Sequence, residues 1–253
     1  MNTFLWGMLP YACVTLLIGG TIWRYQNDQF GWTTRSSQLY ESTLLKIASP
    51  LFHFGILAVA AGHFMGLVIP KSWTDAIGFS QHNYHLLAMG GGLVAAAATI
   101  IGLVMLIWRR RTTGEVFNAT TTNDKAMYVF LAAAIILGTC ATLFGAHAPD
   151  GTEHNYRETV SPWFRSLFTF QPDVEAMTKA TLPFHLHVLA ALLLFAIWPF
   201  TRLVHAFTAP LHYLFRPYIV YRSRDGVATP SSQGTGGRRG WDPIGTPDRK
   251  TRR

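Results

Sequence analysis

The chain has 253 residues, of which 49% are hydrophobic and only 13% are charged, about half the charged share of a typical soluble domain. The formal net charge is +8, but the basic residues follow the loops and the C-terminal tail, and no DNA- or RNA-binding motif accompanies them. The composition therefore argues against a soluble enzyme and a nucleic-acid-binding protein, and it favours a chain embedded in a membrane.

Five stretches are apolar and long enough to cross the hydrocarbon core of a bilayer, which takes about 20 helical residues. Helix is the form we expect, because every backbone N–H and C=O must be paired within the segment in lipid. The first stretch lacks the basic start and the cleavage site of a signal peptide, so we interpret it as a retained helix. In chain order the predicted membrane helices cover 4–23, 49–70, 86–107, 126–147 and 182–205.

The distribution of Lys and Arg predicts the orientation of this all-α five-helix bundle. Most basic residues lie in the loops after the first and third helices and in the tail, while the other two loops hold few. By the positive-inside rule the N-terminus is outside and the C-terminus is cytoplasmic. We expect one membrane domain over 1–221, with a short interfacial helix in the loop 148–181, and a flexible basic tail over 222–253.

Four histidines lie inside the second and fifth predicted helices, where ionisable or ligating side chains are costly and therefore indicate function. The second helix carries His53 and His63, about 15 Å apart along the axis, and the fifth carries His187 and His205. The two helices are antiparallel, so height pairs His53 with His205 and His63 with His187. A continuous fifth helix would separate its two histidines by about 27 Å, so the pairing requires helix tilt or a kink at Pro199.

Two histidines on facing helices are what a six-coordinate haem iron requires, so the pattern predicts two bis-histidine b-type haems. Small residues near His53 and His63, such as Gly55, Gly62 and Gly66, leave room for a flat macrocycle. Arg202 and Lys46 are the cations expected near the propionates of the cytoplasmic-side haem.

Other interpretations of the histidines are weaker but stay open at this point. Each could pack as a hydrogen-bonded helix residue, and a zinc site would need clustered ligands that neither helix supplies. A transporter that relays protons through its histidines would place carboxylates in its membrane helices, and the five predicted helices contain none. Cys13 and Cys140 lack ligand spacing and are expected to be buried apolar residues.

Several short stretches resemble the gamma subunit of respiratory nitrate reductase, a dihaem membrane cytochrome b. The resemblance extends over roughly residues 4–221, and the two histidine-bearing blocks are its specific part. The matching stretches are 36–38 (SSQ), 51–57 (LFHFGIL), 62–66 (GHFMG), 119–122 (ATTT), 186–188 (LHV) and 199–205 (PFTRLVH).

The resemblance implies a role in electron transfer. His63 and His187 would be the axial ligands of the outer haem, near which quinol is oxidised, and His53 and His205 those of the inner haem. Electrons would pass to an iron–sulfur beta subunit and then to a molybdenum-containing alpha subunit that reduces nitrate. The chain itself would not touch nitrate, and it would reside in the cytoplasmic (inner) membrane of a bacterium or archaeon, in contact with lipid and quinone.

The chain departs from the family pattern at the start of its third helix, where other members carry a lysine implicated in quinol binding. Here His85 and Tyr84 are the candidates for that role, and a histidine there can accept a proton from quinol at neutral pH. The same haem module could serve a nitrite-oxidising complex, with the opposite direction of electron flow, or a sulfur-metabolising one, and the sequence does not choose among them.

Overall fold

The structure, a computed structural model, describes residues 1–32, 37–145 and 154–208. The predicted tail over 222–253 and the end of the fourth predicted helix at 146–147 lie outside these residues. The described part is helical throughout its regular structure. Its long helices are α1 (Leu9–Asn27), α2 (Thr43–His63), α4 (Gln81–Thr112), α6 (Thr122–Phe144) and α9 (Leu182–Ile197).

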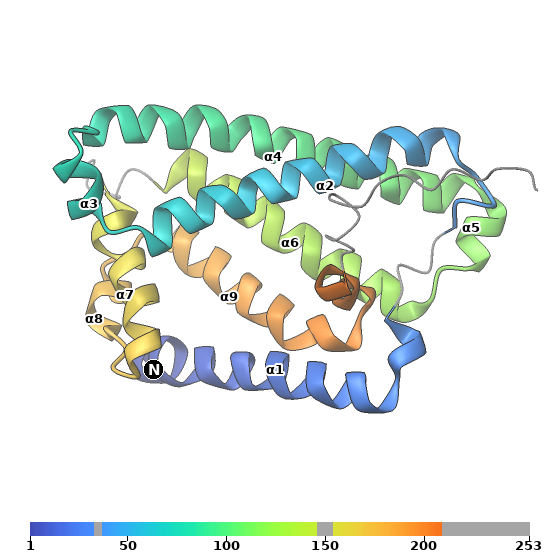
Figure 1. Cartoon of the computed structure of the whole chain (residues 1–253), viewed down its shortest axis with the longest axis horizontal. Coiled ribbons are helices and arrows are strands. Elements are labelled where there is room, and N and C mark those ends of the chain that lie inside the picture. The colour runs from blue at the N-terminus through green and yellow to red at the C-terminus, as the bar shows by residue number, and fades with distance from the viewer. Residues whose placement is uncertain (33–36, 146–153, 209–253) are drawn as a thin grey trace, which may run out of the picture. The chain divides into compact units, whose positions relative to one another are not determined.

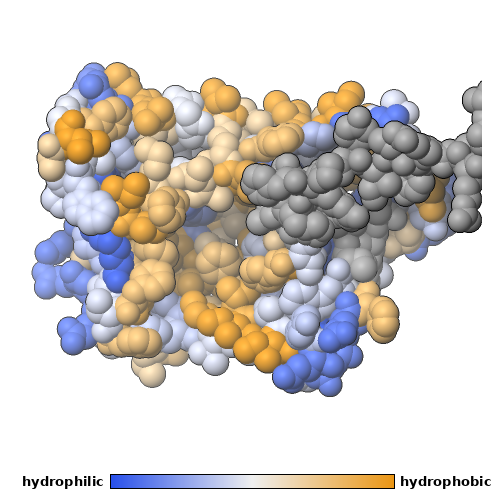
Figure 2. Space-filling view, viewed as in Figure 1, coloured by the Kyte–Doolittle hydropathy of each residue, from blue (hydrophilic) through white to orange (hydrophobic). Residues whose placement is uncertain are grey.

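Two of the membrane spans contain a π-helical segment in addition to their α-helix. The π-helical segment η1 (Thr3–Met8) precedes α1, and the π-helical segment η3 (Phe64–Val68) follows α2. With these extensions, five helices in the described ranges are long and apolar enough to cross a membrane, as predicted. The chain is therefore an all-α integral membrane protein, and large apolar side chains such as Leu57, Val94 and Ile136 are exposed on its helices where lipid would cover them. Figure 2 shows apolar surface across the middle of one face.

Short helices gather at the two ends of the bundle (Figure 1). At one end, called here the α7 end, lie α3 (Lys71–Ala76), α7 (Val160–Ser166) and α8 (Val174–Thr178). At the other, the α5 end, lies α5 (Gly114–Asn118). The short helix predicted in the loop 148–181 is thus confirmed, in the form of α7 and α8.

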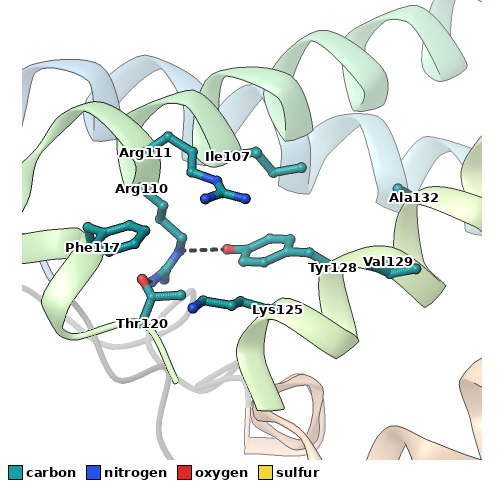
Figure 3. A pocket seen from close by; sticks show the side chains of 9 residues that line it. All are labelled: Ile107, Arg110, Arg111, Phe117, Thr120, Lys125, Tyr128, Val129 and Ala132. Atoms are coloured by element: carbon teal, nitrogen blue, oxygen red, sulfur yellow. Dashed lines mark hydrogen bonds between the residues drawn. The ribbon is translucent and has the colours of Figure 1, made fainter. Parts of the chain in front are cut away.

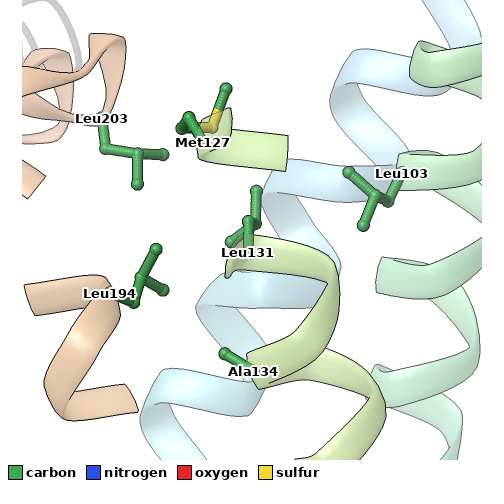
Figure 4. Close-up of a cluster of buried hydrophobic side chains, with 6 residues drawn as sticks. All are labelled: Leu103, Met127, Leu131, Ala134, Leu194 and Leu203. Atoms are coloured by element: carbon green, nitrogen blue, oxygen red, sulfur yellow. The ribbon is translucent and has the colours of Figure 1, made fainter. Parts of the chain in front are cut away.

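Two buried apolar clusters hold the long helices to each other and to the α7 end. The larger joins α4, α6, α9 and the segment after α9 through Leu103, Met127, Leu131, Ala134, Leu194 and Leu203 (Figure 4). The second fixes the N-terminal turn against α7 and α8 through Trp6, Val160, Trp163, Met177 and Ala180. The indole N–H of Trp163 donates to the carbonyl of Trp6 at 2.8 Å, so this contact is polar as well as apolar.

Glycines allow α2 and α4 to approach closely. A Cβ on Gly102 would lie 2.5 Å from the backbone nitrogen of Phe52, and one on Gly55 would lie 2.7 Å from that of Thr99. Small residues at helix contacts are typical of membrane bundles, where close backbone packing replaces the hydrophobic drive. Gly55 is thus occupied by a helix contact and does not provide the space for a macrocycle that the sequence suggests, whereas a methyl added at Gly62 would meet no atom within 4 Å.

The fifth membrane helix stops before it reaches His205. Regular α-helix ends at Ile197, a 3₁₀ turn η6 (Trp198–Phe200) follows, Thr201 is extended, and a second 3₁₀ segment η7 (Arg202–Thr208) carries His205. The fifth helix is therefore shorter than the predicted 182–205, and the kink considered at Pro199 is a break in the helix. Pro199 has no N–H to continue the ladder, and its ring obstructs a further α-helical turn.

Two arginines hold this interruption in place. Arg24 of α1 is 6% exposed, and its Nη1 donates to the carbonyls of Pro199 and Thr201 at 2.6 and 2.7 Å. Arg202 forms a two-pronged ion pair with Asp124 at the start of α6, with both N–O distances at 2.7 Å. Carbonyls released by the break and the first turn of η7 are in this way tied to α1 and α6.

Basic side chains line a pocket of about 290 Å³ at the α5 end, between α4, α5 and α6. Figure 3 shows Arg110, Arg111 and Lys125 around Phe117 and Tyr128, and the Nε of Arg110 donates to the Tyr128 hydroxyl at 2.8 Å. These are the residues from which the positive-inside rule predicts a cytoplasmic location for this end.

Gly102→Ala is expected to lower the stability of the bundle by about 1–3 kcal/mol, because the added methyl collides with backbone of α2 and overpacks the contact. Gly91→Ala is the matched control on the same helix, since its methyl would meet no atom within 4 Å and Ala favours helix over Gly. Thermal unfolding of both variants in detergent, followed by tryptophan fluorescence, checks the difference. Equal unfolding temperatures would contradict the role given to Gly102.

Arg24→Gln should destabilise the protein by about 2 kcal/mol or more, because it leaves buried carbonyls of Pro199 and Thr201 without donors. Arg111→Gln, a change at an exposed arginine, is the control and should shift the free energy of unfolding by no more than about 0.5 kcal/mol. The same unfolding assay compares them, and a similar effect of both substitutions would refute the assignment.

Candidate functional site: two histidine pairs

The four intramembrane histidines lie in two pairs, each formed across the gap between the second and fifth membrane segments. Toward the α7 end, the ring centres of His63 on α2 and His187 on α9 are 5.8 Å apart. Toward the α5 end, those of His53 on α2 and His205 on η7 are 6.2 Å apart. The structure thus brings together the residues that the sequence pairs by height.

The break after α9 explains how both pairs form. His53 and His63 lie on one uninterrupted helix and are therefore about 15 Å apart along its axis. A straight fifth helix would carry its histidines much farther apart. Because the chain turns at Pro199 and Thr201, His205 returns toward α2 at the height of His53.

All four rings present the same nitrogen to the backbone. Nδ1 lies 2.7 Å from the Ser49 carbonyl in His53, 2.8 Å from the Val59 carbonyl in His63 and 3.1 Å from the Ala134 carbonyl in His187. In His205 it contacts the Arg202 carbonyl. A carbonyl can only accept, so Nδ1 carries the proton and Nε2 has the lone pair in every ring. This is the tautomer and orientation that fix an imidazole as a metal ligand.

The ring separations suit a metal ion held between two imidazoles. A metal–imidazole bond of about 2 Å on each side places the ring centres roughly 6 Å apart. The observed 5.8 and 6.2 Å agree with that value, so these residues fit a six-coordinate haem iron. Within the described ranges, no three or more His, Cys, Asp or Glu side chains gather as a metal site.

A glycine sets the position of His187. A Cβ on Gly138 of α6 would lie 2.8 Å from Cε1 of His187, so only glycine lets this ring lie against α6 and reach the Ala134 carbonyl. His185, two residues earlier, faces another way. Its Nε2 contacts the Met177 carbonyl at 2.8 Å, and its ring stacks on Trp6 at 4.9 Å, in agreement with its predicted position away from the pair.

Arg202 and Lys46 are the two cations predicted near the pair of His53 and His205. Arg202 is engaged by Asp124, as described above, and lies three residues before His205. Lys46 lies in the first turns of α2. Arg109 of α4 is 1% exposed and donates to Ser37 and Glu41, which ties the segment before α2 to α4.

The predicted quinol residues Tyr84 and His85 point to different surroundings. His85 is exposed on α4, whereas Tyr84 is 3% exposed and shares a hydrogen bond of 2.7 Å with the hydroxyl of Tyr156. Burial, and then the bond to Tyr84, raises the pKa of the Tyr156 phenol well above its ordinary value, so this phenol stays protonated.

Sequence reasoning missed the buried polar group around this tyrosine pair. Arg157 lies with its guanidinium carbon 4.0 Å from the Tyr84 ring centre and is only 2% exposed. Gly66 makes room for the pair, because a Cβ there would lie 2.5 Å from the Tyr156 hydroxyl. In the sequence, Tyr156 and Arg157 are part of a mixed polar loop without periodicity, so no signal distinguishes them from solvated residues.

A profile of the nitrate reductase gamma subunit family matches residues 2–224 of the chain. The chain belongs to the nitrate reductase gamma subunit family. The match includes all five membrane helices and all four paired histidines.

Relatives of this family member come from several bacteria. The chain is 43% identical over 220 residues to the nitrate reductase gamma chain of Bacillus subtilis, covering 87% of the chain and 97% of the relative. It is 34% identical over 225 residues to the respiratory nitrate reductase 2 gamma chain of Escherichia coli, covering 88% and 98%. It is 55% identical over 241 residues to the nitrate reductase-like protein NarX of Mycobacterium tuberculosis, covering 95% of the chain but only 36% of that relative's length.

Proposed function

We propose that this gamma-family chain is the cytochrome b subunit of a membrane-bound nitrate reductase, which oxidises quinol and passes electrons through two b-type haems. The observation that carries the proposal is that four histidines form two pairs between the second and fifth membrane segments. In each ring, Nδ1 is bound to a backbone carbonyl. Membership in the gamma subunit family supports it.

His63 with His187 and His53 with His205 would supply the axial nitrogens of the outer and the inner haem. Each haem, when bound, supplies a one-electron iron couple. The protein's own part is to fix the four rings through their carbonyl acceptors and to leave Nε2 available. The helical rise of α2 sets about 15 Å along its axis between the two histidines that it contributes.

Two protein partners complete the proposed electron path. An iron–sulfur beta subunit would receive electrons from the inner haem at the α5 end, and a molybdenum-containing alpha subunit would reduce nitrate. We place the α5 end on the cytoplasmic side, because Arg109, Arg110, Arg111 and Lys125 lie there. The membrane is then the cytoplasmic membrane of the cell.

Quinol would react near His63 and His187, at the α7 end. His85 is the residue that a quinol dissolved in the membrane can reach, since it is exposed on α4, and a neutral imidazole can accept a quinol proton. Tyr84 would border the quinol site from the interior of the bundle, where its hydroxyl is hydrogen-bonded to that of Tyr156.

The carboxylate of Asp124 has a structural role and is not needed as a proton relay, because it binds Arg202 of η7. Asp124 is held by Arg202 in a two-pronged ion pair and caps α6 together with Thr121. A carboxylate in such a pair stays ionised, and it holds η7 instead of carrying protons.

Purified wild-type protein should show b-type absorption in a dithionite-reduced minus oxidised spectrum, with two haems per chain. His63→Ala and His187→Ala should each remove the same single haem, and His53→Ala and His205→Ala the other one, because each iron loses one of its two ligands. His185→Ala, a change in the neighbouring ring that faces Trp6, is the control and should keep both haems. A well-folded preparation without b-type absorption would sink the cytochrome proposal.

His85→Ala should slow quinol oxidation by roughly tenfold or more through loss of the proton acceptor, while both haems stay bound and reducible by dithionite. The rate of haem reduction by a soluble quinol analogue measures the effect. His82→Ala, at another exposed histidine of the same helix, serves as control. Equal rates in the two variants would remove His85 from the quinol site.

A further inference from the structure

Arg157 is a buried cation whose bonds are incomplete. Its Nη2 donates to the Thr74 hydroxyl at 3.0 Å and reaches the Ile69 carbonyl at 3.5 Å, and its guanidinium lies over the Tyr84 ring. Its Nε and Nη1 are buried without a hydrogen-bond partner in the described part of the chain. Arginine is always charged, so a side chain 2% exposed with two unpaired donors favours an anion as its further partner.

The described groups around Arg157 do not supply that anion. Glu158, the next residue, is bound to Lys71 at 2.6 Å, and the Tyr84 and Tyr156 hydroxyls bond each other. Among the described residues, no carboxylate forms an ion pair with Arg157. Arg165, a further cation at this end, donates to the Leu67 carbonyl at 3.0 Å.

Contacts link Arg157 to the pair formed by His63 and His187. The Tyr156 hydroxyl lies against Gly66, which follows His63 by about one helical turn. The Tyr156 ring packs on Phe184 with centres 5.7 Å apart, and Phe184 precedes His187 by about one turn. Tyr156 therefore contacts both segments that carry His63 and His187, and Arg157 follows it directly in the sequence.

We propose that Arg157 binds a propionate carboxylate of the outer haem through one of its two open donors, Nε or Nη1. The inference rests on the proposed function, because the haem supplies the carboxylate. A carboxylate matches this buried cation because it accepts a charge-assisted hydrogen bond and also neutralises the charge, whereas a neutral quinol oxygen only accepts. Arg157 is then a positioning residue that also sets the charge beside the outer iron.

The proposal has an electrostatic consequence. A fixed positive charge near the iron favours the reduced state, so Arg157 raises the midpoint potential of the outer haem. It also keeps the propionate ionised at neutral pH, since an adjacent cation lowers a carboxyl pKa. Arg157 exerts neither effect on the pair of His53 and His205, because that pair lies toward the opposite end of the bundle.

The test is a spectroscopic redox titration of the full chain with its haems, in nanodiscs, for the wild type, Arg157→Gln, Arg157→Lys and Arg165→Gln. The outer haem is identified as the component lost in His63→Ala. Arg157→Gln should keep two haems per chain, lower the outer midpoint potential and make it pH-dependent near neutrality. The inner potential should not move, Arg157→Lys should fall between, and Arg165→Gln, the matched arginine at the same end, should match the wild type.

Other outcomes would overturn the proposal. An unchanged outer potential in Arg157→Gln, or an equal shift in Arg165→Gln, means that Arg157 does not pair with the haem. If Asp150→Asn or Glu153→Gln raises the outer potential, and combining it with Arg157→Gln restores the wild-type value, the anion is a carboxylate of the loop itself. Loss of both haems in Arg157→Gln and Arg157→Lys alike assigns the residue to folding. A wild type without haem refutes the proposed function, whereas two haems with no shift refute this inference alone.

Discussion

Backbone carbonyls cannot remain unpaired inside lipid, and the bundle meets this constraint at the interruption between α9 and η7. Pro199 ends the regular helix, and Arg24 from the first membrane helix supplies donors to the carbonyls that are released. The Asp124–Arg202 ion pair fixes the segment that follows. His205 owes its position to these contacts, because an uninterrupted helix would carry it past the height of His53. The pair of His53 and His205 thus depends on the break after α9, which Arg24 of α1 and Asp124 of α6 hold in place.

Charge at the two ends of the bundle is handled differently. Toward the α5 end, the buried Arg24 and Arg109 and the partly buried Arg202 each bind carbonyls or carboxylates of the chain. They tie the segments between the long helices to those helices. At the α7 end, Arg157 is equally buried but lacks an anion among the described residues. The same type of residue therefore stabilises the fold at one end, while at the other it is available as a binding group.

Helix packing in this protein is organised around small residues at points of closest approach. Gly55 and Gly102 bring α2 against α4, and Gly138 lets His187 lie against α6. Gly66 accommodates the tyrosine pair beside His63. Each contact fixes a histidine-bearing helix from the side opposite its partner, and the two imidazoles of each pair lie about 6 Å apart. Rigid support of this kind is what a metal ligand needs to keep its geometry through a change of oxidation state.

Much of this protein was determined by its sequence alone. Hydrophobic length predicted the five membrane helices, because lipid permits few alternatives, and the antiparallel order of the second and fifth helices predicted the pairing of His53 with His205 and His63 with His187. Tertiary structure decided what depends on contacts between distant residues. The break at Pro199 is supported by Arg24, which lies far away in the chain, and Gly55 packs against Thr99 where local sequence suggests open space. In the sequence Arg157 looks like a solvated loop cation, but folding buries it beside Tyr84, and two of its donors have no partner among the residues that the structure describes. Burial and hydrogen-bond satisfaction are properties of the assembled bundle, so the sequence alone does not show them.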